Sequence, residues 1–373
     1  MYDYFFIIGK NHNAFNEKNL AKKVSKKIYS NDGKLDINYF NKGFGIQTII
    51  RNSSSDLDKI FFKSKNAYVF SNSRIDNKED LIQDHPELSK LSQSEIIFWL
   101  YERYGDEIYK LIEGPFSFLI YYASNDRVVG GRDLFGQRPL DYVITSNYFA
   151  VSSDASAFSA FDMYKTINHD KVLQFILNEH LKDGESFYKN IKKVNGGNYF
   201  IYTNNEIRIR RYLKPENLIS HTAINKKILF SNFKKNFIKT LTSIIGNVDK
   251  NLATTLSGGL DSSSLFLAAN KITTKKNIYS FSVHFSGISK KDFLKTDEEY
   301  YLKKVLLKTS SNHKKIFLKF NDSGPINNKN KILPFSQPYG VINGYMHEAI
   351  YNECKNNNIE FLVDGLFGDE VIS

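Results

Sequence analysis

The sequence predicts an α/β protein of two domains, the first rich in short strands and the second built on a doubly wound parallel sheet. Its 373 residues correspond to about two domains at ~150 residues each. Runs of aromatic and β-branched residues fill the first part, whereas buried strands alternate with helical patterns from residue 252 onward. With 41% hydrophobic and 24% charged residues, the composition excludes bulk disorder.

In the first part, turn signals such as Ser124-Asn125-Asp126 and Asn204-Asn205 separate the expected strands. These strands are Ala67–Phe70, Phe116–Tyr122, Val128–Arg132, Leu140–Ile144, Tyr148–Ser152, Tyr199–Tyr202 and Ile207–Arg211. Amphipathic helices are expected at about Ser94–Tyr104 and Asp170–Glu179.

The second part alternates between strand and helix, which predicts the parallel sheet. Its expected strands are Leu252–Leu256, Ile278–Phe285, Lys315–Phe320 and Glu360–Val363, and its expected helices are Ile228–Gly246, Ser262–Ala269, Asp297–Lys308 and Tyr345–Cys354. The polar stretch Lys214–Asn225 contains Pro215 and is the expected boundary, giving domains at 1–213 and 226–373.

Composition and charge restrict the partners and the compartment. The net charge is +11, but 42 of the 51 basic residues are scattered lysines, so specific nucleic-acid binding is not expected. The single Cys354 excludes an internal disulfide and a cysteine zinc cluster. The first nine residues lack a positive n-region and no apolar run reaches ~18 residues, so we expect neither a signal peptide nor a membrane span, and a cytoplasmic location.

The run Leu256–Ser264 is the motif with the most chemistry, because it follows an expected strand and opens an expected helix. Small residues let the backbone approach an anion, and the helix N-terminus attracts it. Asp261 suits such a site only if a divalent cation joins it to the anion, so the loop predicts a phosphate with Mg²⁺. It is not a Walker loop, since no Gly-Lys-Ser/Thr follows. The alternative is an ordinary Gly-Gly turn capped by Asp or Ser.

This run resembles the pyrophosphate loop of ATP pyrophosphatases, in the form seen in asparagine synthetases. Segments of the first part resemble a class II glutamine amidotransferase domain: Met1–Gly9, Ser71–Asn77, Gly114–Phe118, Arg132–Leu140 and Val194–Tyr199. Segments of the second part resemble the synthetase domain: Ser280–Val283, Thr296–Glu298, His313 and Asp364–Glu370.

The resemblance implies an Ntn-type αββα sandwich followed by a Rossmann-like ATP-pyrophosphatase domain, with ATP and Mg²⁺ as its ligands. It implies that pyrophosphate is held by Ser257, Gly258, Gly259, Ser262 and Ser263. It also implies adenosine contacts at Leu256, Val283 and Gly365, and metal contacts at Asp261 and Asp369.

The amidotransferase site departs from the family pattern. Tyr2 occupies the position of the nucleophilic cysteine, and a phenol with a pKa near ~10 is a poor substitute. Asn72 keeps the oxyanion position, but Ser73 replaces the neighbouring glycine and Gln93 replaces a substrate-binding Asp. We therefore expect a folded domain that does not hydrolyse glutamine.

The synthetase part departs as well. Phe367 replaces a glycine of the second loop, and the chain stops at Ser373, before the helical segment that completes the family's acceptor pocket. The expectation is a fragment, a split gene, or a chain completed by a second copy or a partner, which leaves its activity open.

The implied function is an ATP-dependent carbon–nitrogen ligase that adenylates a carboxylate, by default aspartate, and forms an amide with ammonia. Because the cysteine is missing, a second reading is an enzyme like β-lactam synthetases or lasso-peptide cyclases, which use an amine of the substrate. A third reading is a catalytically inactive binding protein.

Overall fold

The computed structural model describes residues 3–11, 16–28, 34–49, 61–161, 166–177, 179, 184–214, 216, 225–246, 248, 251–273, 278–286, 299–309, 312–319 and 344–366. The described residues up to 216 belong to one compact unit, and those from 225 onward belong to a second. None of the helices in these ranges combines the length and the apolar character needed to cross a membrane.

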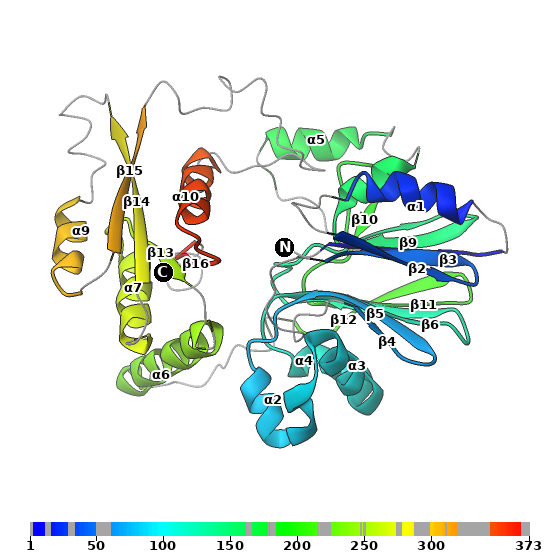
Figure 1. Cartoon of the computed structure of the whole chain (residues 1–373), viewed down its shortest axis with the longest axis horizontal. Helices are drawn as coiled ribbons and strands as arrows, with labels where there is room; N and C mark the ends of the chain where they lie inside the picture. Colours follow the sequence, from blue (N-terminus) through cyan, green and yellow to red (C-terminus); the bar gives the residue numbers. More distant parts are fainter. Residues whose placement is uncertain are drawn as a thin grey trace. The chain divides into compact units, whose positions relative to one another are not determined.

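The first unit is built on two six-stranded antiparallel sheets (Figure 1). One has the order β10-β8-β9-β1-β3-β2, formed by Lys192–Lys193, Asp141–Ile144, Tyr148–Ser152, Tyr4–Gly9, Gly43–Ile49 and Lys34–Phe40. The other has the order β12-β11-β7-β6-β5-β4, formed by Glu206–Arg211, Asn198–Thr203, Arg127–Arg132, Phe116–Tyr122, Ala67–Ser73 and Phe61–Lys63.

The two sheets pack face to face because successive side chains of a strand point to opposite sides. In β1, Tyr4, Phe6 and Ile8 join the core between the sheets. Phe5 and Ile7 point the other way and join a separate core on the outer face. A buried strand of this kind therefore reads as a continuous apolar run.

Helices cover both outer faces. Helix α1 (Glu17–Ser25) packs on the first sheet through Ala21 and Val24. Helix α3 (Gln93–Tyr104) packs on the second sheet. Among the described residues of this unit, the other α-helices are α2 (Lys78–Asp84), α4 (Ile108–Leu111) and α5 (His169–Ile176). The order helix, sheet, sheet, helix confirms the predicted αββα sandwich.

The second unit contains a four-stranded parallel sheet of order β15-β14-β13-β16 (Figure 1). These strands are Asn312–Lys319, Ile278–Ser286, Leu252–Thr255 and Phe361–Val363. Helices α6 (Lys226–Ile245), α7 (Leu260–Ile272) and α9 (Glu299–Leu306) share one core with the sheet. Helix α10 (Gly344–Asn356) shares a second core that contains Ala253 and Phe281.

Helices on both faces of a parallel sheet confirm the predicted doubly wound, Rossmann-like fold. Strand order reverses between β13 and β16, since β14 and β15 lie on one side of β13 and β16 lies on the other. In such sheets, ligands bind at the carboxyl ends of the strands beside this switch point. The expected ligand site therefore lies where β13 and β16 end.

All predicted strands and helices are present, with bounds within three residues of the predicted ones wherever the ends are described. The structure adds elements that were not predicted, among them α1 and the hairpin of β2 and β3.

Candidate functional site

The backbone between β13 and α7 forms a glycine-dependent turn. The N–H of Leu256 donates to the carbonyl of Phe281 at 2.8 Å, which extends the pairing of β13 with β14. Gly258 then has a φ of +107°, a conformation that residues with a side chain rarely adopt. Gly259 is the N-cap of α7 and has no side chain to cap it. The first N–H groups of this 13-residue helix therefore remain available to an anion.

Serine hydroxyls hold the shape of this turn. The hydroxyl oxygens of Ser257 and Ser262 lie 3.1 Å apart, and the Ser257 hydroxyl also accepts from the N–H of Gly259 at 3.1 Å. The N–H of Ser257 donates to the Ser262 hydroxyl at 3.2 Å. The two serines thus link the start of the loop to the first turn of α7.

A cavity of about 520 Å³ lies at the carboxyl ends of β13 and β16 and beside the middle of β14. It brings together seven of the sequence-predicted residues: Leu256, Ser257, Gly259, Asp261, Ser262, Val283 and Gly365. Gly258 and Ser263 are not among its lining residues. The hydroxyl of Ser263 is buried and has no hydrogen-bond partner among the described residues. Its N–H donates to the carbonyl of Gly259 at 3.1 Å, so its predicted role as a pyrophosphate contact requires a rotation of the side chain.

The loop after β16 closely approaches the start of α7. A Cβ atom at Gly365 would lie 3.1 Å from the backbone N of Ser262 and 3.2 Å from Cβ of Asp261. Both distances are shorter than ordinary van der Waals contact, so the approach depends on glycine. The two loops at the switch point therefore form one continuous wall.

Two carboxylates line this cavity, those of Asp261 and Asp364. Carboxylate oxygens suit Mg²⁺, which keeps several waters and commonly takes its other ligands from a substrate phosphate. Predicted metal contact Asp369 lies outside the described residues. Among the residues that the structure describes, there is no cluster of three His, Cys, Asp or Glu side chains arranged to hold a metal. The donors present fit a Mg²⁺ ion shared with a nucleotide, rather than a metal centre made by protein alone.

Several lining residues were missed in the sequence. Asp364 opens the segment that resembles the second pyrophosphate loop, and its position there was the available signal. Met346, His347 and Ile350 come from α10, where no local motif marks them.

Asn72, the residue that matches the oxyanion position by resemblance, has a buried side-chain amide. Asn72 in β5 is 1% exposed, and its Nδ2 has no hydrogen-bond partner among the described residues. Ser73 and Ser117 also have buried hydroxyls that lack a partner within this part of the chain. A buried donor without a hydrogen-bond partner lowers the stability of the fold, so the Nδ2 of Asn72 is a candidate contact for a ligand or for a neighbouring group. Tyr2 lies outside the described residues.

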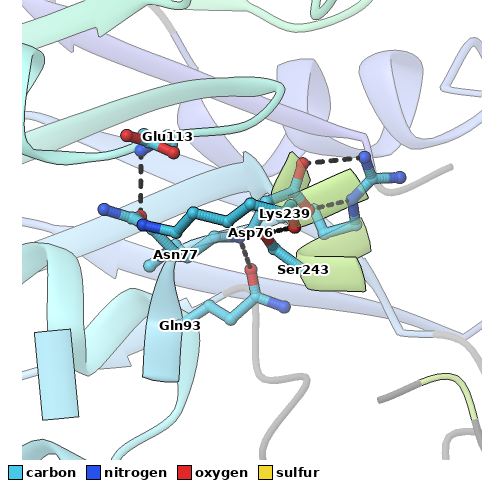
Figure 2. A network of polar contacts seen from close by, with 8 residues as sticks. Asp76, Asn77, Gln93, Glu113, Lys239 and Ser243 are labelled. Carbon is cyan, nitrogen blue, oxygen red and sulfur yellow. Dashed lines mark hydrogen bonds and ion pairs between the residues drawn. The ribbon is translucent and has the colours of Figure 1, made fainter. Parts of the chain in front are cut away.

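The segment after Asn72 is fixed by polar contacts (Figure 2). The side-chain oxygen of Gln93 accepts from the N–H of Ile75 at 3.2 Å. The side-chain oxygen of Asn77 accepts from the N–H of Glu113 at 3.0 Å. Gln93, which replaces an acidic residue of the family pattern, is thus bonded to the backbone of its own unit.

Family models match both parts of the chain. Residues 58–213 match the model described as "Glutamine amidotransferase domain". Residues 247–372 match the model described as "Asparagine synthase". Together the two matches cover most of the chain, in the order expected from the sequence.

Known proteins agree with these matches. A candidate second glutamine-hydrolysing asparagine synthetase of Methanocaldococcus jannaschii is 25% identical over 283 residues, which are 75% of this chain and 53% of that protein. "Asparagine synthetase [glutamine-hydrolyzing] 1" of Bacillus subtilis is 23% identical over 55% of this chain and 32% of that protein. The chain thus spans about half the length of the first relative and about a third of the second.

One solved structure, described as "Structure of the allosteric regulatory enzyme of purine biosynthesis", covers 97% of this chain and 89% of its own. It is 13% identical to this chain, with a TM-score of 0.42. The paired family models and the relatives give the same assignment: the chain belongs to the asparagine synthetase family.

Proposed function

We propose that the second unit binds ATP with Mg²⁺ and activates a carboxylate for amide formation. The observation that supports this most directly is the switch-point cavity, where the free N-terminus of α7, two carboxylates and the glycine loops converge. Backbone N–H groups and a helix dipole stabilise phosphate charge. A cavity with these groups suits a nucleoside triphosphate better than an uncharged ligand.

The reaction we propose has two steps. A carboxylate oxygen attacks the α-phosphorus of ATP, and the bond to pyrophosphate breaks, which gives an acyl-adenylate. The nitrogen of ammonia or an amine then attacks the acyl carbon, AMP leaves, and the nitrogen loses a proton. Mg²⁺, held by Asp261 with Asp364 or Asp369, would neutralise charge on the phosphates.

The chain's own residues bind and orient the nucleotide in this scheme. The N–H groups in the first turn of α7, from Leu260 to Ser262, would face the departing pyrophosphate and stabilise its growing charge. Leu256 and Val283 line the part of the cavity assigned to adenosine. Gly365 lets the loop after β16 approach the start of α7, which closes the wall of the cavity.

Aspartate is the default carboxylate, and the nitrogen is proposed to come from ammonia or from an amine of the substrate. The second source follows from Tyr2, which replaces the cysteine that would release ammonia from glutamine. An enzyme that joins an amine and a carboxylate of its own substrate is therefore the second candidate.

Exchange of labelled pyrophosphate into ATP tests the adenylation step. We expect exchange that requires both Mg²⁺ and a carboxylate, with aspartate tested first and a carboxylate panel second. Asp261→Ala should abolish it, whereas Ser264→Ala, an exposed position on α7 outside the cavity, should not. Tight MgATP binding with no exchange for any carboxylate would refute the ligase proposal and favour an inactive binding protein.

A further inference from the structure

A chain of polar side chains runs beside the cavity, on the sheet face that carries α7 and α9. The hydroxyl of Ser280 is hydrogen-bonded to Nδ1 of His313 at 2.9 Å, and that of Ser282 to Nε2 of the same ring at 3.1 Å. The Ser282 hydroxyl is also hydrogen-bonded to Nε2 of His284 at 2.9 Å. Both serines are buried, with 0% and 3% of their surfaces exposed.

Strand register produces this arrangement. Ser280 on β14 pairs with His313 on β15, and Ser282 is the next residue of β14 on the same face. The imidazole of His313 can therefore bond both Ser280 and Ser282, two successive residues on the same face of β14. The interaction holds the middle of β14, just past the level where β13 ends, and there Ser282 and Val283 line the cavity.

The imidazole of His313 is suited to this role as a neutral ring. Burial, followed by the nearby Lys315 and His284, lowers the pKa of His313 to about 4. A neutral ring donates from one nitrogen and accepts at the other, so it satisfies both serine hydroxyls. Lys315, which lies on the same face, is itself paired with Glu299 of α9 at 2.5 Å.

We propose that His313 is a positioning residue for the nucleotide site, which fixes the part of β14 that lines the cavity by bonding Ser282. The inference rests on the proposed function, since the nucleotide is assigned to the cavity that Ser282 and Val283 line. His313 itself is not among the lining residues, so it acts through its neighbour.

Replacing His313 by Asn or Gln distinguishes its bond to Ser280 from its bond to Ser282. The side-chain amide of Asn places its polar atoms near Nδ1 and can reach only Ser280, whereas that of Gln extends to the position of Nε2 and can reach Ser282. Titration calorimetry with MgATP should show about fivefold to tenfold weaker binding for His313→Ala and His313→Asn, which corresponds to one lost ordering hydrogen bond. His313→Gln should restore most of the affinity. Ser282→Ala should resemble His313→Ala, and Ser280→Ala should have a smaller effect.

Amide hydrogen exchange of Ser282–Ser286 without nucleotide provides the independent readout. We expect faster exchange in His313→Ala and His313→Asn and near wild-type exchange in His313→Gln. Unchanged MgATP affinity in His313→Ala, or equal affinities of the Asn and Gln variants, would overturn the positioning role. If the wild type binds no MgATP, the proposed function fails, and the exchange rates alone decide whether His313 orders β14.

Discussion

Gly365 gives the sharpest test of the cavity wall, because the structure shows how little room it has. A Cβ atom there would lie 3.1 Å from the N of Ser262 and 3.2 Å from Cβ of Asp261, where ordinary contact begins at 3.4 Å. Gly365→Ala therefore requires a displacement of a few tenths of an ångström between the second loop and the start of α7. Overpacking costs ~1–3 kcal/mol, and one methyl group belongs at the low end.

The expected loss for Gly365→Ala is about 1 kcal/mol of MgATP binding, or roughly fivefold in Kd. Gly365→Val adds two further carbons against the same atoms, so we expect a loss of about 3 kcal/mol, more than a hundredfold. Titration calorimetry measures both, and thermal unfolding verifies that the variants are folded. Ser264→Ala, at an exposed position of α7 outside the cavity, is the control and should bind within about twofold of wild type. Wild-type affinity in folded Gly365→Val would show that the two loops do not form a joint nucleotide site.

Three further outcomes follow from other positions. Glutamine incubated with the purified chain should release no glutamate above a blank, because Tyr2 replaces the nucleophile; release that Tyr2→Phe abolishes would contradict this. Gly258→Ala, at a φ of +107°, should lower the unfolding free energy of the second unit by ~1–3 kcal/mol in urea titrations, and an unchanged value would remove the argument for a strained loop. Burial, with Asp154 nearby, raises the pKa of Asp3 from 3.8 to about 6. Its folded form thus binds more protons between these values, and its contribution to stability is present below pH 3.8 and lost as the pH rises through about 6. Above pH 6, the free energy of unfolding of Asp3→Asn in denaturant titrations should therefore exceed that of wild type, by up to about 3 kcal/mol. A difference that does not change with pH would contradict the assignment.

Strands with clear turn signals could be predicted from the sequence. The strands Phe116–Tyr122 and Tyr148–Ser152 have the predicted bounds, since their apolar runs are closed by polar turns. The unpredicted β3 contains Gly43 and Gly45, which locally suggest a break. Glycine is needed at both positions because neighbouring parts of the fold leave no room for a side chain. A Cβ at Gly45 would lie 2.1 Å from the ring of Phe70, and one at Gly43 would lie 1.9 Å from the backbone oxygen of Ile7.

Helix α1 was missed for a different reason. Only Ala21 and Val24 of its nine residues are buried, so the apolar stripe is too short for a periodic signal. Packing against the first sheet, rather than a local sequence pattern, stabilises this helix.

In the candidate site, residues close together in the sequence could be predicted, whereas residues brought in from distant segments could not. The loop residues follow one another in the sequence, so spacing and the strand-to-helix context could predict them. Met346 and Ile350 reach the cavity on a helix from the opposite face of the sheet, and the bond between Ser280 and His313 spans 33 residues. Such contacts depend on strand order and register, which a single sequence specifies only through the finished fold.

Titration of the full chain with MgATP tests the central claim most directly, in wild type, Asp261→Ala and the exposed control Ser264→Ala. The account predicts saturable binding by wild type and the control, and at least about tenfold weaker binding when the carboxylate next to the glycine loop is removed. Equal affinity of wild type and Asp261→Ala, or no binding by wild type, would contradict a nucleotide site at the switch point of the second unit.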